Sequence, residues 1–205
     1  MKTTLIYLAA GGSRRFGRNK LLHLWEGEPL FAPLLKRLIS LVSRHAEWEI
    51  LVVTRYPELK AEAETLWRRN KEKREEAEGG FRVINSPDSE KGMSETIKAA
   101  LRAAPFSEAY AFFVADQPYL KEDTAERFLT EMEKLNGKEG TGLGCVCFGE
   151  RTGNPVWFSG EYRDELLALT GDKGGKEVVK AHRERVCLFP VEEERELWDV
   201  DIPVK

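Results

Sequence analysis

The stretch LIYLAAGGSRRFGRNKLL, residues 5–22, decides the fold because it joins an apolar run to a glycine-rich, basic loop. The apolar run predicts a short buried strand. Gly11 and Gly12 let the backbone turn tightly and approach a ligand closely, and consecutive amides there can cradle phosphate oxygens. Arg15 and Lys20 add positive charge on side chains long enough to reach the same space. The stretch therefore predicts a polyphosphate-binding loop after the first strand.

Two common phosphate-binding motifs do not match this loop. It lacks the GK[ST] that ends the P-loop pattern, and it lacks the G-x-G-x-x-G of dinucleotide-binding proteins. A glycine-rich turn with incidental basic residues therefore remains an alternative as long as the loop is considered by itself.

The rest of the chain alternates between strand and helix patterns, which predicts an α/β fold with a mostly parallel sheet covered on both faces. We expect one domain over residues 1–205. Strands are predicted at residues 3–10, 48–54, 81–85, 109–115, 142–148, 185–191 and 197–201. Helices are predicted at residues 31–45, 57–77, 93–104, 124–135, 160–171 and 174–184.

The composition argues against several classes of partner. The chain carries 32 basic and 35 acidic residues, so its net charge of -3 gives no overall attraction to nucleic acid or to an anionic membrane. No apolar run approaches the ~20 residues that span a bilayer, and the first residues do not have the pattern of a signal peptide. Three cysteines suit a reducing compartment. We expect a cytoplasmic protein that binds neither nucleic acid nor membrane.

Acidic residues follow two of the predicted strands. The strongly apolar run 109–115 ends at Asp116, and the late strand 197–201 carries Asp199 and Asp201 on one face. In open parallel sheets, ligands bind beyond the carboxyl ends of the strands. Carboxylates brought together there would form a hard oxygen site suited to Mg²⁺, although Asp116 could also be a helix cap or a loop acid.

The opening stretch also resembles the signature of a known family. LAAGGSRRFGRNKLL resembles L-A-A-G-x-S-x-R-x-G-x-x-K-L-L, the signature of the molybdopterin nucleotidyltransferases and most closely that of the molybdenum cofactor cytidylyltransferases. Every fixed position matches: Leu8, Ala9, Ala10, Gly11, Ser13, Arg15, Gly17, Lys20, Leu21 and Leu22. Further segments resemble the family in the same order along the chain: GMSETIKAAL, DQPYL, RTGNPVWF, LTGDKGGKEVV and DVDIP.

The resemblance implies a Rossmann-like three-layer sandwich of the nucleotide-diphospho-sugar-transferase type. It also implies transfer of CMP from CTP to the terminal phosphate of a molybdopterin-type cofactor, with release of pyrophosphate. Arg15 and Lys20 would stabilise charge on the phosphoryl oxygens, and Asp116 and Asp201 would hold Mg²⁺ or Mn²⁺. The implied nucleotide-binding residues are Ala9, Ala10, Gly11, Gly12, Ser13, Arg15, Lys20, Gly92, Ser94 and Thr96.

On the acceptor side, the resemblance implies a pocket lined by Gly153, Asn154, Pro155, Gly171, Asp172 and Gly174. This side also holds most of the departures from the family pattern, such as Lys176 where arginine is usual, and a lysine loses bidentate phosphate geometry. The family resemblance also leaves room for transient contact with a molybdoenzyme or a chaperone.

Two other interpretations stay open. The nearer one keeps the fold but changes the substrate, to a guanylyltransferase or a nucleotidyltransferase acting on a sugar phosphate or alcohol phosphate. Guanylyl members resemble L-A-G-G at the loop, whereas this chain has Ala9 and Ala10, which favours CTP. The farther one is a non-catalytic nucleotide-binding or cofactor-binding partner, which would not need Arg15, Lys20 and both carboxylates.

Overall fold

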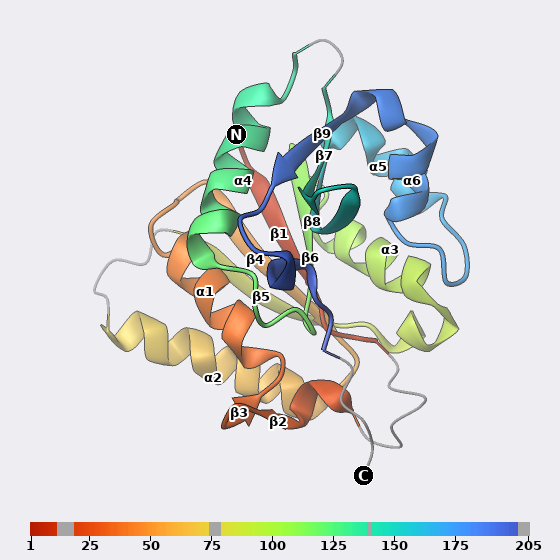
Figure 1. The fold of residues 1–205 in the computed structure, drawn as a ribbon. Helices are drawn as coiled ribbons and strands as arrows, with labels where there is room; N and C mark the ends of the chain where they lie inside the picture. The colour runs from red at the N-terminus through yellow and green to blue at the C-terminus, as the bar shows by residue number, and fades with distance from the viewer. Residues whose placement is uncertain (12–18, 74–78, 139–140, 201–205) are drawn as a thin grey trace.

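The computed structural model describes residues 1–11, 19–73, 79–138 and 141–200 (Figure 1). Its strands are β1 (Thr3–Leu8), β2 (Leu24–Trp25), β3 (Glu28–Pro29), β4 (Trp48–Thr54), β5 (Gly80–Asn85), β6 (Ala109–Val114), β7 (Leu143–Phe148), β8 (Arg151–Ser159) and β9 (Val186–Pro190). Its α-helices are α1 (Ala32–Val42), α2 (Pro57–Lys73), α3 (Met93–Ala103), α4 (Glu122–Leu135), α5 (Arg163–Leu167) and α6 (Lys176–Ala181). Its 3-10 turns are η1 (Lys20–Leu22), η2 (Pro87–Lys91), η3 (Gly160–Tyr162), η4 (Arg183–Arg185) and η5 (Glu194–Leu197).

A seven-stranded sheet in the order β5-β4-β1-β6-β8-β7-β9 forms the middle layer. Only β8 pairs antiparallel with its neighbours, so the other six strands point the same way. β1 is central, with Tyr7 opposite Val52 on one side and Phe113 on the other. The sheet therefore brings the carboxyl ends of β1, β4, β5 and β6 to one edge, where the sequence predicts the ligand site.

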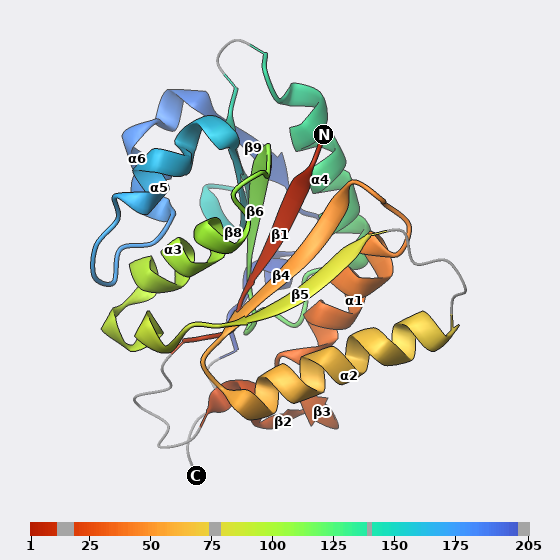
Figure 2. The same cartoon turned by 180° about the vertical axis from the view of Figure 1, so that it is seen from behind.

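Helices cover both faces of the sheet, as Figures 1 and 2 show from opposite sides. One face packs against α1, α2 and α4, and the other against α3, α5 and α6. Side-chain alternation in β1 explains this division, because Leu5 and Tyr7 enter the first core while Ile6 enters the second. The three-layer α/β sandwich with a mostly parallel sheet is therefore confirmed.

The structure corrects several predicted elements. The segment RTGNPVWF, treated above only as part of the acceptor pocket, lies within β8, which the sequence analysis missed. The predicted strand at 197–201 is wrong over its described part, because Leu197 ends the η5 turn and residues 198–200 form no strand. The predicted helix at 160–171 is confined to η3 and α5, and residues 168–171 lie beyond it.

An interruption in the strand pairing explains why β8 accommodates a proline. Cys145 of β7 pairs with Val156, but the next residue, Val146, pairs with Gly153, so Asn154 and Pro155 are left out of the ladder. Such irregularities are where sheets tolerate proline, which cannot donate a ladder hydrogen bond. The interruption also places Asn154 on the wall of the two cavities described below.

Candidate active site

A cavity of about 770 Å³ opens at the carboxyl ends of the parallel strands. Its wall begins with the backbone that follows β1, where Ala10 and Gly11 line it. The amide of Ala9 donates to Val53 O at 2.9 Å, which extends the β1–β4 ladder to the start of the glycine loop. The ladder therefore holds this end of the loop against the cavity.

Lys20 and Asp116, which come from segments 96 residues apart, meet in this cavity. Lys20 Nζ donates to Asp116 Oδ2 at 2.7 Å, and their side chains are only 17% and 22% exposed. Lys20 Nζ also lies 3.4 Å from the carbonyl oxygen of Val200. The residues expected to bind phosphate and metal thus lie close enough to act on the same phosphate group.

Asp199 also lines the cavity and interacts electrostatically with Asp116, whereas the sequence analysis assigned Asp201 as the second ligand. Gln117 Nε2 donates to Asp199 Oδ1 at 2.8 Å. Burial, and then the negative charge of Asp116, raise the pKa of Asp199 above its usual range. A divalent cation would relieve the repulsion between two such carboxylates, so this donor set fits Mg²⁺.

The segment that carries Asp199 is anchored to the loop that carries Asp116. Val200 N donates to Asp116 O at 2.8 Å, and Gln117 Nε2 lies 3.3 Å from Leu197 O. The contact between residues 197–200 and the loop after β6 therefore depends on tertiary hydrogen bonds rather than on the strand predicted for residues 197–201.

Four predicted site residues, Gly12, Ser13, Arg15 and Asp201, lie outside the described residues. Within the described part of the chain, no group of three or more His, Cys, Asp or Glu side chains could hold a metal ion. Among the described residues, the candidate metal ligands are therefore Asp116 and Asp199. The role of Asp201 as a further ligand stays a prediction.

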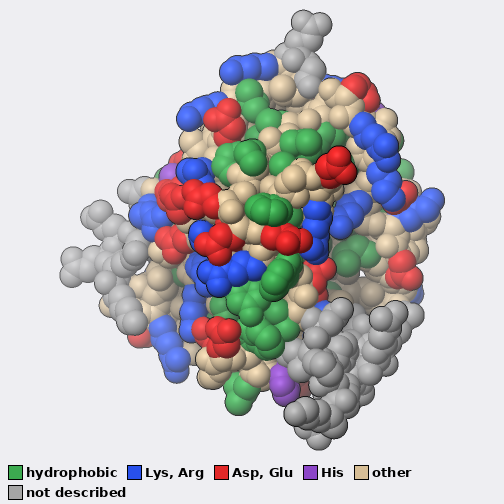
Figure 3. All heavy atoms as spheres, viewed as in Figure 1, with side chains coloured by type: hydrophobic (Ala, Val, Ile, Leu, Met, Phe, Trp, Pro, Cys, Tyr) green, Lys and Arg blue, Asp and Glu red, His purple; other side chains and the backbone are tan. Residues whose placement is uncertain are grey.

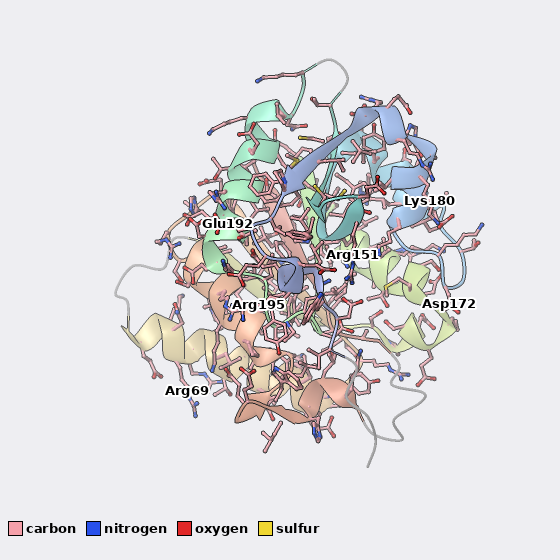
Figure 4. All side chains as sticks on the ribbon, in the orientation of Figure 1. Arg69, Arg151, Asp172, Lys180, Glu192 and Arg195 are labelled. Carbon is pink, nitrogen blue, oxygen red and sulfur yellow. The ribbon has the colours of Figure 1, made fainter. Side chains whose placement is uncertain are left out.

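A second cavity, of about 610 Å³, adjoins the first. Its apolar wall comes from the second core face and includes Phe112, Val156 and Phe158. Asn154, Asp172 and Gly174, all predicted to bind the acceptor, also line it. Three lysines, Lys173, Lys176 and Lys180, line it too, and Lys180 is paired with Glu177 of the same wall at 2.8 Å. Figure 4 labels Asp172 and Lys180 on this side of the molecule. The cavity therefore suits an acceptor with an apolar body and anionic groups.

The other predicted acceptor residues, Gly153, Pro155 and Gly171, do not line either cavity. A Cβ built on Gly153 would lie 2.9 Å from Leu197 Cδ2, so this glycine allows the C-terminal segment to pack closely. The structure therefore does not bring these three residues to the cavity surface, where an acceptor would be contacted directly.

Thr96 and Ser94, both expected to contact the nucleotide, differ in position. Thr96 lines the larger cavity, and its hydroxyl donates to Ser89 Oγ at 2.9 Å. Ser94 is fully buried, and its Oγ has no hydrogen-bond partner among the described residues. A direct contact between Ser94 and a nucleotide would require the cavity wall to move.

Gly92 joins the wall of the larger cavity to the loop of the acceptor side. Ser94 N donates to Gly171 O at 3.1 Å, and Gly92 has a φ of +135°. A Cβ built on Gly92 would lie 2.3 Å from Gly171 O, a contact that real side chains do not make. Glycine is thus required here both by backbone conformation and by space.

Replacement of Gly92 by alanine is expected to lower the free energy of unfolding by roughly 1–3 kcal/mol because it combines a strained φ with a backbone clash. Urea denaturation of the variant measures this loss. Gly174→Ala is the matched control, since its Cβ would make an ordinary 3.4 Å contact with Met93 Cγ. Equal stability of the two variants would contradict the assigned role of Gly92.

The sequence analysis missed two charged residues that line the larger cavity, Arg55 and Glu90. Arg55 directly follows β4, and Glu90 lies on η2, which follows β5. Their position after parallel strands is a signal that the sequence did contain, because such ends face the ligand. The lysines of the second cavity carry a weaker signal, since a charged helix and loop are typical of solvated surface.

The cysteines do not contribute a reactive group to the site. Cys145 and Cys147 are buried on β7, and neither lines the two cavities. Burial, followed by the charges of the other two cysteines, raises the pKa of the Cys145 thiol to about 11. The thiol is therefore protonated near neutral pH.

On the face shown in Figure 3, acidic and basic side chains are interspersed around apolar ones, and no large patch carries charge of a single sign. Among the described residues, no helix is long and apolar enough to cross a membrane.

The fold and the site together define a class of protein. The cavity at the carboxyl ends of the parallel strands has the size of a small-molecule site, and Gly11, Lys20 and Asp116 on its wall are groups suited to phosphate and metal. The chain belongs to the MobA-like NTP transferase domain family, whose pattern matches residues 5–186. The resemblance seen in the sequence is therefore confirmed at the level of the family, and the chain is a nucleotidyltransferase.

Individual relatives and solved structures resemble this chain over most of its length. The chain is 25% identical over 201 residues to the purine catabolism protein PucB of Bacillus subtilis (strain 168), covering 97% of this chain and 91% of PucB. The fold matches a CMP:2-keto-3-deoxy-manno-octonic acid synthetase solved with CTP, at a TM-score of 0.64 and 12% identity, covering 93% and 90% of the two chains. It also matches molybdopterin-guanine dinucleotide biosynthesis protein A from Archaeoglobus fulgidus, at a TM-score of 0.60 and 21% identity, covering 98% and 93%. These neighbours confirm the nucleotide-diphospho-sugar-transferase-type fold.

Proposed function

We propose that the chain, as one domain over residues 1–205, transfers CMP from CTP to the terminal phosphate of a molybdopterin-type cofactor and releases pyrophosphate. One observation carries this proposal: the two cavities share a wall. Five residues line both of them, namely Leu8, Met93, Val114, Asn154 and Asp172. A nucleotide in the larger cavity and an acceptor in the smaller one would therefore lie side by side, as group transfer requires.

The proposed chemistry needs little proton transfer. A phosphate monoester is already ionised near pH 7, so its oxygen can attack the α-phosphorus of the nucleotide without a protein base. The bond to the β-phosphate breaks, and pyrophosphate leaves with the negative charge. The roles of the protein are then alignment of the two substrates and stabilisation of charge that grows on the phosphoryl oxygens.

Lys20 and Arg15 are proposed to stabilise that charge. The structure supports the position of Lys20, whose ammonium group lies beside Asp116 within the cavity. Asp116 and Asp199, with Asp201, are proposed to hold Mg²⁺ or Mn²⁺. When bound, the metal would neutralise phosphate charge.

The acceptor cavity supports an anionic, partly apolar acceptor. Its floor of sheet side chains offers area for a ring system, and Lys173 and Lys176 offer charge for phosphate or other anions. These features fit a phosphorylated pterin. They also fit other phosphorylated acceptors with an apolar body, and so the acceptor is the part of the proposal that most needs a direct assay.

A ligand panel tests the nucleotide half of the proposal. CTP, GTP, ATP and UTP are each added with Mg²⁺, and the unfolding temperature is measured. A ligand at 100 times its Kd stabilises the native state by about 2.7 kcal/mol, which raises the Tm of a chain of this size by roughly 5–10 °C. We expect the largest rise with CTP. If no nucleotide raises the Tm, the proposed function is wrong.

The alternative that deserves the next test is guanylyl transfer, because one structural neighbour is named for a guanine dinucleotide. Ala10 is buried and lines the nucleotide cavity. The L-A-G-G loop pattern of guanylyl members has a glycine at this position. Its methyl group would crowd a purine more than a pyrimidine. We therefore favour CTP.

Ala10→Gly is expected to shift the selectivity toward GTP by up to about tenfold, because one methyl group is worth ~1 kcal/mol. The measurement is kcat/KM for CTP and for GTP with the wild-type protein and the variant. A wild-type protein that prefers GTP, or a variant with unchanged selectivity, would contradict the cytidylyl assignment while leaving the nucleotidyltransferase class intact.

A further inference from the structure

Arg55 and Glu90 line the nucleotide cavity beyond strands β4 and β5, whereas Asp116, the ion-pair partner of Lys20, lies beyond β6. Arg55 follows β4 and Glu90 follows β5, whereas Asp116 follows β6 on the other side of β1. Three strand spacings separate β5 from β6, which is about 14 Å. An extended nucleotide with its phosphates at Lys20 and Asp116 would thus reach toward Arg55 and Glu90 with its base.

The Arg55 side chain is held in a fixed position. Its Nη1 donates to Glu90 Oε1, and its Nη2 donates to the Tyr56 hydroxyl at 3.0 Å. The guanidinium carbon also lies 4.9 Å from the centre of the Tyr56 ring. Tyr56 in turn donates its hydroxyl to Gly11 O at 3.1 Å. Hydrogen bonds through Tyr56 therefore link the Arg55–Glu90 ion pair to the backbone of Gly11, where the glycine loop begins.

Beside Arg55 and Glu90, burial and charge favour a neutral polar group of a ligand over a phosphate group. The Arg55 side chain is only 20% exposed, and its Nε is buried with no partner among the described residues. Glu90 lies at the mouth of the cavity, with its side chain 73% exposed. Its carboxylate neutralises Arg55 and would repel a phosphate. A nucleobase edge carries no net charge but presents donors beside acceptors, which this pair can match.

We propose that Arg55 and Glu90 read the base of the nucleotide and select cytosine over uracil. The proposal rests on the proposed function. Glu90 accepts a hydrogen bond from the exocyclic amino group of cytosine, a pairing that carboxylates make with this base in nucleic acids. Arg55 donates to the neighbouring ring nitrogen and carbonyl oxygen, which are both acceptors in cytosine.

Uracil is rejected by the same two side chains. It carries a carbonyl oxygen where cytosine has the amino group, so two acceptors would face each other at Glu90. Its ring nitrogen N3 carries a hydrogen where Arg55 needs an acceptor. Selectivity then comes from an unfavourable contact with the wrong base as well as from a favourable contact with the right one.

The decisive variant is Glu90→Gln, whose amide can donate to the uracil carbonyl. Kd values for CTP and UTP are measured by calorimetry with Mg²⁺ present. We expect the wild-type protein to prefer CTP by at least about tenfold, and the variant to narrow that ratio by roughly tenfold, chiefly by binding UTP more tightly. Arg55→Lys keeps the charge but loses the fork of donors, and is expected to weaken CTP binding by about tenfold.

Asp88→Asn is the matched control because Asp88 lies on the same 3-10 turn, pairs with Lys91 and does not line the cavity. Its CTP to UTP ratio should equal that of the wild-type protein. Glu90→Ala serves as a second variant, which should lose the selectivity without gaining affinity for UTP. If the wild-type protein and Glu90→Gln bind nucleotides with the same CTP to UTP selectivity, the base-reading role is wrong, whereas the proposed function is unaffected. Failure of every nucleotide to bind the wild-type protein would overturn the proposed function itself.

Discussion

Replacing Lys20 by alanine is expected to lower turnover by roughly 10²-fold or more while weakening nucleotide binding much less. The reason is that the ammonium group is placed to meet charge that grows only as the phosphoryl group is transferred. In the structure this group already lies 2.7 Å from Asp116 Oδ2, inside the cavity that would hold the phosphates. Single-turnover rates and nucleotide Kd values, measured on the same preparation, separate the two effects.

The control for this variant is Lys36→Ala. Lys36 is also ion-paired, with Glu28, but its side chain is 50% exposed and it does not line the nucleotide cavity. Its turnover should match that of the wild-type protein. If Lys20→Ala retained full turnover, the lysine would have no part in the reaction and the proposed site would lose its principal charge.

Asp116→Asn is expected to abolish Mg²⁺-dependent nucleotide binding or transfer and to leave the fold intact. An amide is a poorer ligand for a hard cation than a carboxylate. The loss should be visible in a titration of nucleotide binding against Mg²⁺ concentration, in which the variant no longer responds to the metal. Asp199→Asn should weaken the same response, because Asp199 lies in the same cavity and the charge of Asp116 contributes to its raised pKa.

Asp123→Asn serves as the control for both carboxylate variants. Asp123 is paired with Arg127 on α4, with its side chain 76% exposed, so its loss should not change the response to Mg²⁺. A variant at Asp116 that needs no more Mg²⁺ than the wild-type protein would show that this carboxylate is not a metal ligand.

Much of the fold follows from local patterns. The run 109–115 and the proline after it fix β6 and the loop that carries Asp116, because a continuous apolar run is typical of a strand buried on both faces. β8 escaped prediction because Gly153 and Pro155 are typical of a loop, and only the interrupted pairing with β7 shows how a strand contains them.

The predicted residues that line the larger cavity, such as Ala10, Lys20 and Asp116, are those at which a sequence motif and a strand end coincide. Asp199 was placed on a predicted strand that does not form, since its position depends on Gln117 and on the backbone of Asp116. The contact between Arg55 and Glu90 was not predicted because it joins two segments that only the strand order brings together, although the position of each residue after a strand was a usable signal. Long-range contacts of this kind leave no periodic signal in the chain.

The most direct test of nucleotidyl transfer is a ³¹P NMR measurement of the products formed from CTP, Mg²⁺ and molybdopterin by the wild-type protein under anaerobic conditions. We expect pyrophosphate to appear only when molybdopterin is present, together with an equal amount of a new pyrophosphate linkage between CMP and the acceptor. Release of orthophosphate from the γ-position, or consumption of CTP that does not depend on the acceptor, would contradict the proposed reaction.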